Sequence, residues 1–120
     1  MPKIVISAVE SIQPGKTLDD IRAAWAHVAE AAAKTPGVRR FQSSWDEESK
    51  TALVTEVLDS PEAYHAFFGN IDVAMVTASV KFEQITLQCA ADQVAGFGDM
   101  VKNFGMKVYI TDACAGHDEL

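Results

Sequence analysis

Cysteine is scarce in this sequence, which has 120 residues and is 48% apolar. Its two cysteines, Cys89 and Cys114, lie far apart, with no Cys-x-x-Cys spacing and no cluster of histidine and cysteine around them. Zinc ligands and redox pairs are usually separated by only a few residues. We therefore expect reduced structural thiols, no metal site, and a single domain over residues 1–120 that folds on its hydrophobic core alone.

Positive charge and long apolar runs are also sparse. Ten lysines and arginines stand against 17 aspartates and glutamates, for a net charge of −7. A chain of this charge repels phosphate backbones, so no nucleic-acid partner is expected. No run approaches the ~18 consecutive apolar residues of a membrane span, and the first apolar run is too short for a signal peptide. We therefore expect no membrane association and a cytoplasmic protein.

The last four residues, His117–Leu120, match an endoplasmic-reticulum retrieval address. Such an address acts only on a protein that has been translocated, and the sequence offers no translocation signal. We therefore interpret residues 113–120 as a solvated acidic tail.

Motifs for nucleotide and hydrolase chemistry are missing as well. The sequence has no Gly-x-x-x-x-Gly-Lys-Ser/Thr loop, no Gly-x-Gly-x-x-Gly after a strand, no Gly-x-Ser-x-Gly and no His-Glu-x-x-His. Nucleotide-binding, serine-hydrolase and zinc-protease functions therefore have no support, and we expect no cofactor.

Hydrophobic periodicity predicts strands and helices in alternation. A β-branched run over residues 3–9 ends at a Pro-Gly turn, and apolar residues at spacings of three and four then predict a helix that Thr17 caps. Strict alternation predicts strands over 38–46 and 83–89. Residues 51–58 are apolar in both phases, which indicates an interior strand with both faces covered.

The remaining elements are predicted by start signals and spacing. A second helix is expected to begin at Ser60, where a capping serine is followed by proline. Residues 71–78 predict a further helical turn or two. Apolar residues spaced by three and four over 94–104 predict one last helix, and 107–111 a fifth strand.

The order strand, helix, strand, strand, helix, strand predicts an α+β fold: a ferredoxin-like split βαβ antiparallel sheet with both helices on one face. The strands over 3–9 and 51–58 also offer apolar side chains to the uncovered face, so an exposed apolar patch is expected there. A second copy would cover it, and we therefore predict a homodimer closed into an α+β barrel. The core spans about 3–90, and a helix-strand extension follows over 91–112.

Three short segments carry a family resemblance: Ser11–Lys16, Thr35–Val38 and Glu56–Tyr64. They combine a Pro-Gly turn after the first strand, a helix that ends in Pro-Gly, and an acidic strand end that leads into a helix containing Glu-Ala. Over roughly residues 3–90 the chain resembles the antibiotic biosynthesis monooxygenase-like, dimeric α+β barrel proteins. The resemblance implies the same barrel and, as an activity, oxygenation without a cofactor.

The resemblance does not transfer a catalytic histidine by alignment. Relatives commonly have a histidine four residues after the alanine of the Glu-Ala pair, where this chain has Phe67. The nearest histidine, His65, follows Ala63 by two residues, and a shift of two turns a side chain to another helix face. His65 still lies at the border between the apolar stripe and solvent, with Glu62 one turn earlier, so it is the candidate catalytic base.

A cofactor-free oxygenase takes its electrons from the substrate, so a dry pocket and one well-placed base suffice. An aromatic-lined cleft between sheet and helices is the candidate substrate site. Its candidate contacts are Trp45, Tyr64, Phe41, Trp25, Phe68 and Asn70. Each has a plainer alternative, because aromatic residues at this spacing also form ordinary core, an asparagine after glycine also forms a turn, and His65 could be an exposed surface residue.

Three functions are consistent with this sequence. The first is a cofactor-independent monooxygenase that acts on a small aromatic or quinol-type substrate. The second is a non-catalytic dimeric barrel that binds a small apolar ligand, as a stress-associated or accessory protein. The third is a haem-binding or haem-degrading barrel, which requires a histidine inside the pocket. His27 lies on the solvent side of its predicted helix and is a weaker candidate.

Overall fold

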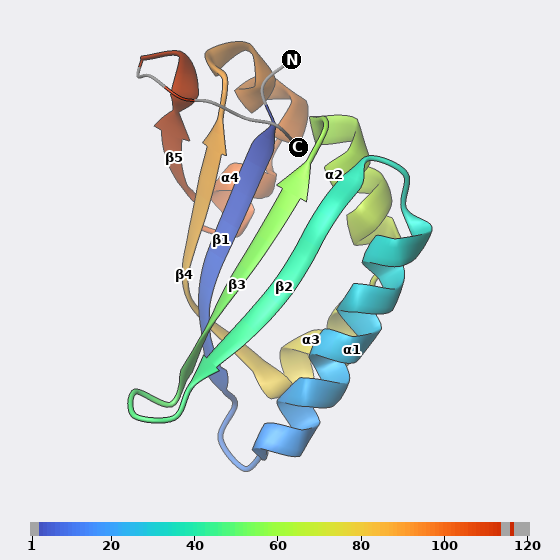
Figure 1. The fold of residues 1–120 in the computed structure, drawn as a ribbon, viewed down its shortest axis with the longest axis vertical. Helices are drawn as coiled ribbons and strands as arrows, with labels where there is room; N and C mark the ends of the chain where they lie inside the picture. Colours follow the sequence, from blue (N-terminus) through green and yellow to red (C-terminus); the bar gives the residue numbers. More distant parts are fainter. Residues whose placement is uncertain (1–2, 114–115, 117–120) are drawn as a thin grey trace.

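The computed structural model describes residues 3–113 and residue 116, and shows a curved sheet with helices on one of its faces (Figure 1). The predictions for Cys114 and for the ending His117–Leu120 fall outside the described residues. Among the helices that are described, none has the length and apolar character needed to cross a membrane.

Five strands form one sheet in the order β2-β3-β1-β4-β5. Every pair among the first four strands is antiparallel, whereas β5 runs parallel to β4. This confirms the predicted split βαβ arrangement, with the fifth strand extending one edge and β3 in the interior. The strands are β1 (Ile4–Ile12), β2 (Val38–Asp46), β3 (Thr51–Leu58), β4 (Val80–Cys89) and β5 (Lys107–Ile110).

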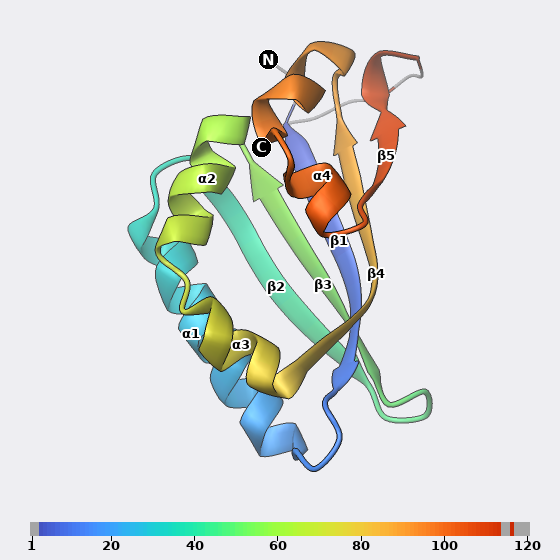
Figure 2. The ribbon, with the colours of Figure 1, turned by 180° about the vertical axis from the view of Figure 1, so that it is seen from behind.

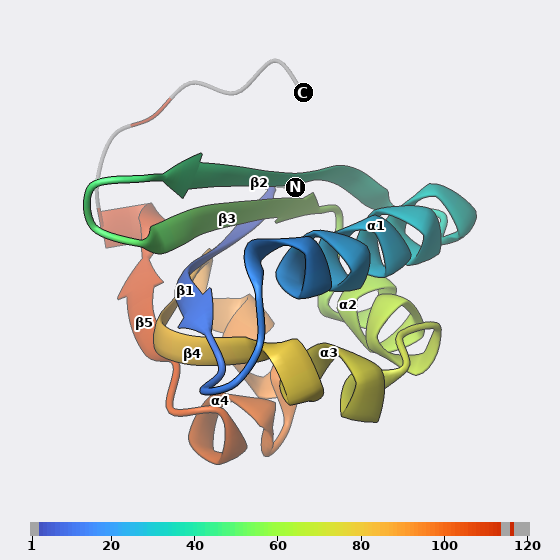
Figure 3. The same ribbon diagram turned by 90° about the horizontal axis from the view of Figure 1, so that it is seen from below.

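The helices lie together on one side of the sheet (Figures 2 and 3). Thr17 caps the first of them by accepting the amide of Asp20, and Ser60 caps the second by accepting the amide of Ala63, so both predicted helix starts are confirmed. The α-helices are α1 (Leu18–Lys34), α2 (Pro61–Gly69), α3 (Val73–Ser79) and α4 (Met100–Asn103), and the 3₁₀ helices are η1 (Ala91–Phe97) and η2 (Thr111–Ala113).

The prediction of a single C-terminal helix over 94–104 is wrong. The chain forms η1, reverses at Gly98, and then makes the short helix α4. Gly98 has a φ of +60°, a conformation that glycine adopts without steric cost and that ends a right-handed helix. Phe97 is therefore fully buried, while Phe104 stays 36% exposed on the far side of the break.

The uncovered face of the sheet is more polar than the sequence suggests. Val5 and Val9 of β1 point to this face, and Leu53 beside Val9 is 54% exposed. The register places Ser7 and Thr55 opposite each other between these apolar positions, so a polar row divides the apolar residues. The homodimer that would cover this face stays a prediction.

The turn between α1 and β2 requires glycine at position 37. Gly37 has a φ of +89°, which other residues rarely adopt, and a Cβ at this position would lie 2.8 Å from the Cβ of Ala63. Its carbonyl oxygen also accepts the amide of Asp59 at 2.8 Å. The turn therefore packs directly on the first turns of α2 and helps to position that helix over the sheet.

Replacing Gly37 with alanine is expected to lower the free energy of unfolding by about 2–5 kcal/mol, through left-handed backbone strain and overpacking against Ala63. Gly15→Ala is the matched control, because Gly15 has a φ of +83° but open space where its Cβ would lie. Urea denaturation measures both changes. Equal losses in the two variants would show that contact with Ala63 contributes nothing.

Candidate active site

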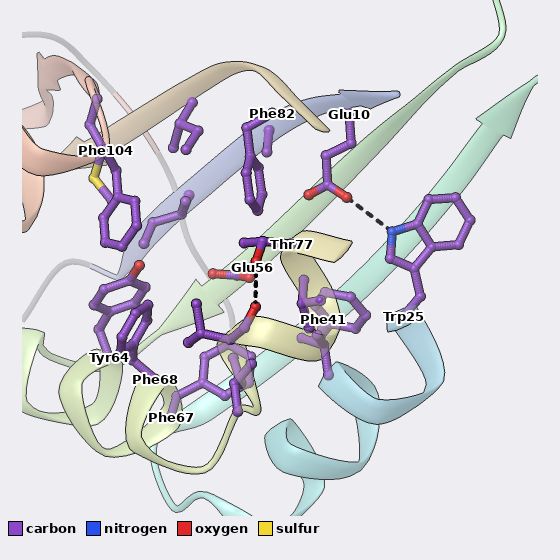
Figure 4. A pocket seen from close by; sticks show the side chains of 18 residues that line it. Glu10, Trp25, Phe41, Glu56, Tyr64, Phe67, Phe68, Thr77, Phe82 and Phe104 are labelled. Carbon is purple, nitrogen blue, oxygen red and sulfur yellow. Dashed lines mark hydrogen bonds between the residues drawn. The ribbon is translucent and has the colours of Figure 1, made fainter. Parts of the chain in front are cut away.

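A cavity of about 110 Å³ lies between the sheet and the helices (Figure 4). Residues of β1 and β3 form part of its floor, and side chains of α1, α2 and α3 form walls. Its surface is almost entirely apolar. The lining residues are Ile6, Ala8, Glu10, Trp25, Val28, Phe41, Glu56, Tyr64, Phe67, Phe68, Ile71, Val73, Val76, Thr77, Phe82, Ile85, Phe104 and Met106.

Two glutamates interrupt this apolar lining. In β1 the inward-facing residues Ile4, Ile6 and Ala8 are followed at the same phase by Glu10, which is 5% exposed. In β3 the carboxylate at the inward phase is Glu56, which pairs with Ile6 across the sheet. Alternation along each strand therefore directs both carboxyl groups toward the helices, where a carboxylate is costly.

Glu10 is held by a buried hydrogen bond. The indole Nε1 of Trp25 donates to Oε1 of Glu10 at 3.0 Å, from α1 to β1. Burial raises the pKa of Glu10 to about 7, and the Trp25 bond opposes this shift because it stabilises the ionised form. Near neutral pH, Glu10 therefore exchanges readily between its carboxylate and carboxylic acid forms.

Glu56 is the more strongly perturbed of the two acids. Its carboxyl group keeps some accessible surface because it faces the cavity, but it lies deep within the protein. Burial, and to a smaller extent the negative charge of Glu10, raises the pKa of Glu56 to about 8. The two side chains reach the cavity from positions offset by four residues along adjacent strands, roughly 13 Å of strand. Figure 4 shows both carboxyl groups among the side chains that line the cavity.

The cavity lining also contains two hydroxyl groups, those of Tyr64 and Thr77. Burial, followed by the charge of Glu56, raises the pKa of Tyr64 above its ordinary value, so this phenol stays protonated and can donate a hydrogen bond. The Thr77 hydroxyl donates to the carbonyl oxygen of Val73 at 2.9 Å and keeps its oxygen as an acceptor. Neither lysine, arginine nor histidine is among the residues that line the cavity.

Four of the substrate contacts expected from the sequence do line the cavity: Trp25, Phe41, Tyr64 and Phe68. Trp45 does not, although its ring packs on Trp25 with centroids 6.5 Å apart. These contacts supply walls and one hydroxyl group. They provide no group that titrates near neutral pH.

The other predicted site residues lie elsewhere. His65 is exposed, and its Nε2 lies 2.7 Å from the carbonyl oxygen of Gly96, so it joins α2 to η1 and is not among the residues that line the cavity. Asn70 ends α2 and donates to the hydroxyl of Thr35 at 2.9 Å. His27 accepts the amide of Asp72 at 2.8 Å, at the start of α3. His65 therefore lies outside the cavity lining, and its role as the catalytic base stays a prediction.

Glu10 and Glu56 were missed by sequence reasoning, although a signal was present. Each stands at the inward phase of a strand whose other inward residues are apolar, such as Ile6 and Val54. A carboxylate at such a position is rarely buried without a partner or a function. Extending the alternation of the first strand by one residue could have identified Glu10, whereas residues 51–58 are apolar in both phases and gave no inward phase for Glu56.

The fold places this chain in a known structural class: it has the α+β fold of the antibiotic biosynthesis monooxygenase-like proteins, as the resemblance predicted. No protein-family model matches the sequence, and no curated protein matches it. The chain is therefore assigned to this fold class by its structure alone. Its own cavity is apolar and contains two carboxyl groups.

Three solved structures show how far the similarity extends. MupZ from Pseudomonas fluorescens aligns with a TM-score of 0.83 at 13% identity, over 98% of this chain and 96% of its own. SnoaB, a cofactor-independent oxygenase from Streptomyces nogalater, aligns at 0.59 and 15% identity over 72% and 91%. A candidate antibiotic biosynthesis monooxygenase from Chloroflexus aurantiacus aligns at 0.58 and 20% identity over 72% and 90%. The coverage by MupZ shows that the C-terminal elements of this chain have counterparts there.

Proposed function

We propose that this protein is an enzyme that carries out acid–base chemistry on a small uncharged molecule enclosed in the cavity. The observation that supports it is the presence of two carboxyl groups with raised pKa values, Glu10 and Glu56, in an otherwise apolar chamber. Groups with such values near the working pH are efficient proton acceptors and donors.

The hydrogen bond from Trp25 supports different roles for the two acids. It stabilises the ionised form of Glu10, so Glu10 is the base. Burial, together with the smaller effect of the Glu10 charge, keeps Glu56 protonated, so we propose Glu56 as the acid. The substrate proton passes to the Glu10 carboxylate, and the Glu56 proton hydrogen-bonds to, or transfers to, the substrate oxygen on which negative charge develops.

Cofactor-independent monooxygenation is the specific reaction that we propose. A phenolate or enolate formed in the cavity is electron-rich and can reduce dioxygen directly. For a methylene substrate the balance is one substrate and one O₂ giving one ketone and one water, with the substrate supplying all four electrons. The fold shared with SnoaB, described as a cofactor-independent oxygenase, supports this choice.

A second candidate is proton transfer without oxygen, such as an isomerisation. The second carboxyl group favours it, because an oxygenase of this kind needs only one base, whereas moving a proton between two substrate atoms uses a base and an acid together. Glu10 and Glu56 approach the cavity from different positions and suit such a transfer.

The two other functions predicted from the sequence fit the cavity lining to different degrees. A haem-binding barrel requires a histidine in the pocket, and the lining residues include none, with His65 bonded to Gly96 outside it. Among the residues that line the cavity, haem would therefore find no histidine as an axial ligand. A non-catalytic barrel that binds a small apolar ligand fits the same lining and becomes an outcome of the test below.

We expect the protein to catalyse hydrogen–deuterium exchange at the acidic C–H positions of a small enolisable aromatic ketone, such as phenylacetone, under anaerobic conditions in D₂O. Proton NMR measures the exchange, and an oxygen electrode then measures O₂ consumption in air with the same ketone and with methylhydroquinone. Exchange together with O₂ consumption supports the monooxygenase, and exchange alone supports isomerisation. Thermal stabilisation by these compounds without either reaction would leave only a binding protein.

A further inference from the structure

The cavity is small compared with multi-ring aromatic molecules. Its volume is about 110 Å³, whereas an engineered apolar protein cavity of about 150 Å³ holds one benzene molecule. The enclosed part of any ligand is therefore limited to about one six-membered ring. A larger substrate can be accommodated only if part of it remains outside.

The cavity reaches the surface where its lining residues are exposed. Ile6, Ala8 and Phe67 at the sheet and α2 are buried, whereas Phe82 at the start of β4 is 41% exposed and Phe104 after α4 is 36% exposed. Thr77 of α3 is exposed as well. The mouth therefore lies between α3, the start of β4 and the segment that follows α4. Figure 4 shows the Phe104 ring on the side of Phe68 and Tyr64.

The rim of this mouth is aromatic. The Phe104 ring contacts Phe68, with ring centroids 5.6 Å apart, so it is held in place although it is exposed. Phe82 offers a second exposed ring from the start of β4, where it pairs across the strands with Glu10 of β1. Apolar rings held open to water beside a cavity are typical of a surface that a ligand covers.

We propose that the substrate has two parts: an uncharged, hydrogen-bonding head of one-ring size inside the cavity, and an apolar extension that leaves through the mouth and covers Phe82 and Phe104. An anionic head is disfavoured, because Glu10 and Glu56 are the charged groups of the lining. This inference deepens the proposed function, and it rests on that function only for the reaction at the head.

The experiment uses para-alkylphenols as probes of increasing length: phenol, 4-propylphenol and 4-hexylphenol. Binding is measured by calorimetry under anaerobic conditions, so that oxidation cannot contribute. For the wild type we expect affinity to rise about threefold to fourfold for each methylene group that covers the rim. Phe82→Ser and Phe104→Ser should each weaken the binding of 4-hexylphenol at least fivefold, and should change the affinity for phenol less than twofold.

Tyr109→Ser is the matched control, because Tyr109 is an aromatic residue of similar exposure, 50%, on β5, and it does not line the cavity. This variant should bind every phenol of the series with the wild-type affinity. The proposal is overturned if longer phenols bind no better than phenol, or if Tyr109→Ser reduces the chain-length dependence as much as the rim variants. Since binding is measured without turnover, absence of proton exchange or O₂ consumption would overturn the proposed function and leave this result standing.

Discussion

Replacing Glu10 with glutamine is expected to lower the rate of proton transfer in the cavity by about a hundredfold to ten-thousandfold, the usual contribution of a positioned base. Glutamine keeps the size of the side chain, and its amide oxygen can still accept the indole N–H of Trp25. The variant therefore removes the basic group without removing the contact. Deuterium exchange into phenylacetone measures the loss.

The pH dependence of the wild-type rate gives a second readout of the same assignment. The rate should rise as Glu10 ionises near pH 7 and fall as Glu56 loses its proton near pH 8, giving a narrow bell-shaped profile. Glu10→Gln should remove the rising limb, and Glu56→Gln the falling limb.

Two substitutions serve as controls. Glu30→Gln changes an exposed glutamate of α1 that pairs with Lys34, and it should leave the rate unchanged. His65→Gln tests the base expected from the sequence, and it should also leave the rate unchanged because His65 contacts Gly96 outside the cavity. A large loss in His65→Gln with full activity in Glu10→Gln would restore the histidine as the base.

The free energy of unfolding is expected to fall as the pH rises from about 5 to 9. The pKa of Glu10 is raised from 4.5 to about 7 and that of Glu56 to about 8, so between these values and 4.5 the folded protein binds more protons than the unfolded chain. Stability then decreases with rising pH, and the change from Glu10 alone corresponds to about 3 kcal/mol.

Two other groups with shifted pKa values, Tyr64 and Asp59, do not produce this slope. Tyr64, the other titratable residue of the lining, has a raised pKa and stays protonated throughout. The salt bridges from Lys3 and Arg39 lower the pKa of Asp59, so its stabilising effect is lost only as the pH falls well below this window. Neither Tyr64 nor Asp59 therefore changes the stability between pH 5 and 9.

Urea denaturation at several pH values measures the effect, and the double variant Glu10→Gln, Glu56→Gln is the comparison. It should show little dependence on pH over the same range, and it should be more stable than the wild type at pH 9, where the wild type buries two charges. A wild-type stability that is flat or rises between pH 5 and 9 would contradict the burial of these carboxyl groups.

Local signals in the chain predict most of the secondary structure, because the interactions that form it span only a few residues. Thr17 accepts the amide of Asp20, and Ser60 that of Ala63, each within three positions. The C-terminal region shows the limit of such signals. Its apolar spacing continues through Gly98, but the chain reverses there, and spacing alone does not report the φ of a glycine.

The candidate site is predictable in part. The aromatic walls Trp25, Phe41 and Tyr64 lie at core positions of their own elements, so periodicity identifies them. His65 and Asn70 differ, because their positions depend on partners far along the chain, at Gly96 and Thr35. Contacts of that range are not encoded in the spacing of either residue.

The sequence by itself determined the strands, most helices and the split βαβ order, since each follows from residue alternation and local hydrogen bonds. It did not determine which face of the sheet carries Glu10 and Glu56. Tertiary structure alone decided that these two carboxyl groups share one cavity. Their strands become neighbours only through the pairing of β1 with β3, and the chamber is enclosed only because side chains of α1, α2 and α3 pack over the sheet. Burial shifts a pKa only after that closure, because it depends on the atoms that replace water on every side.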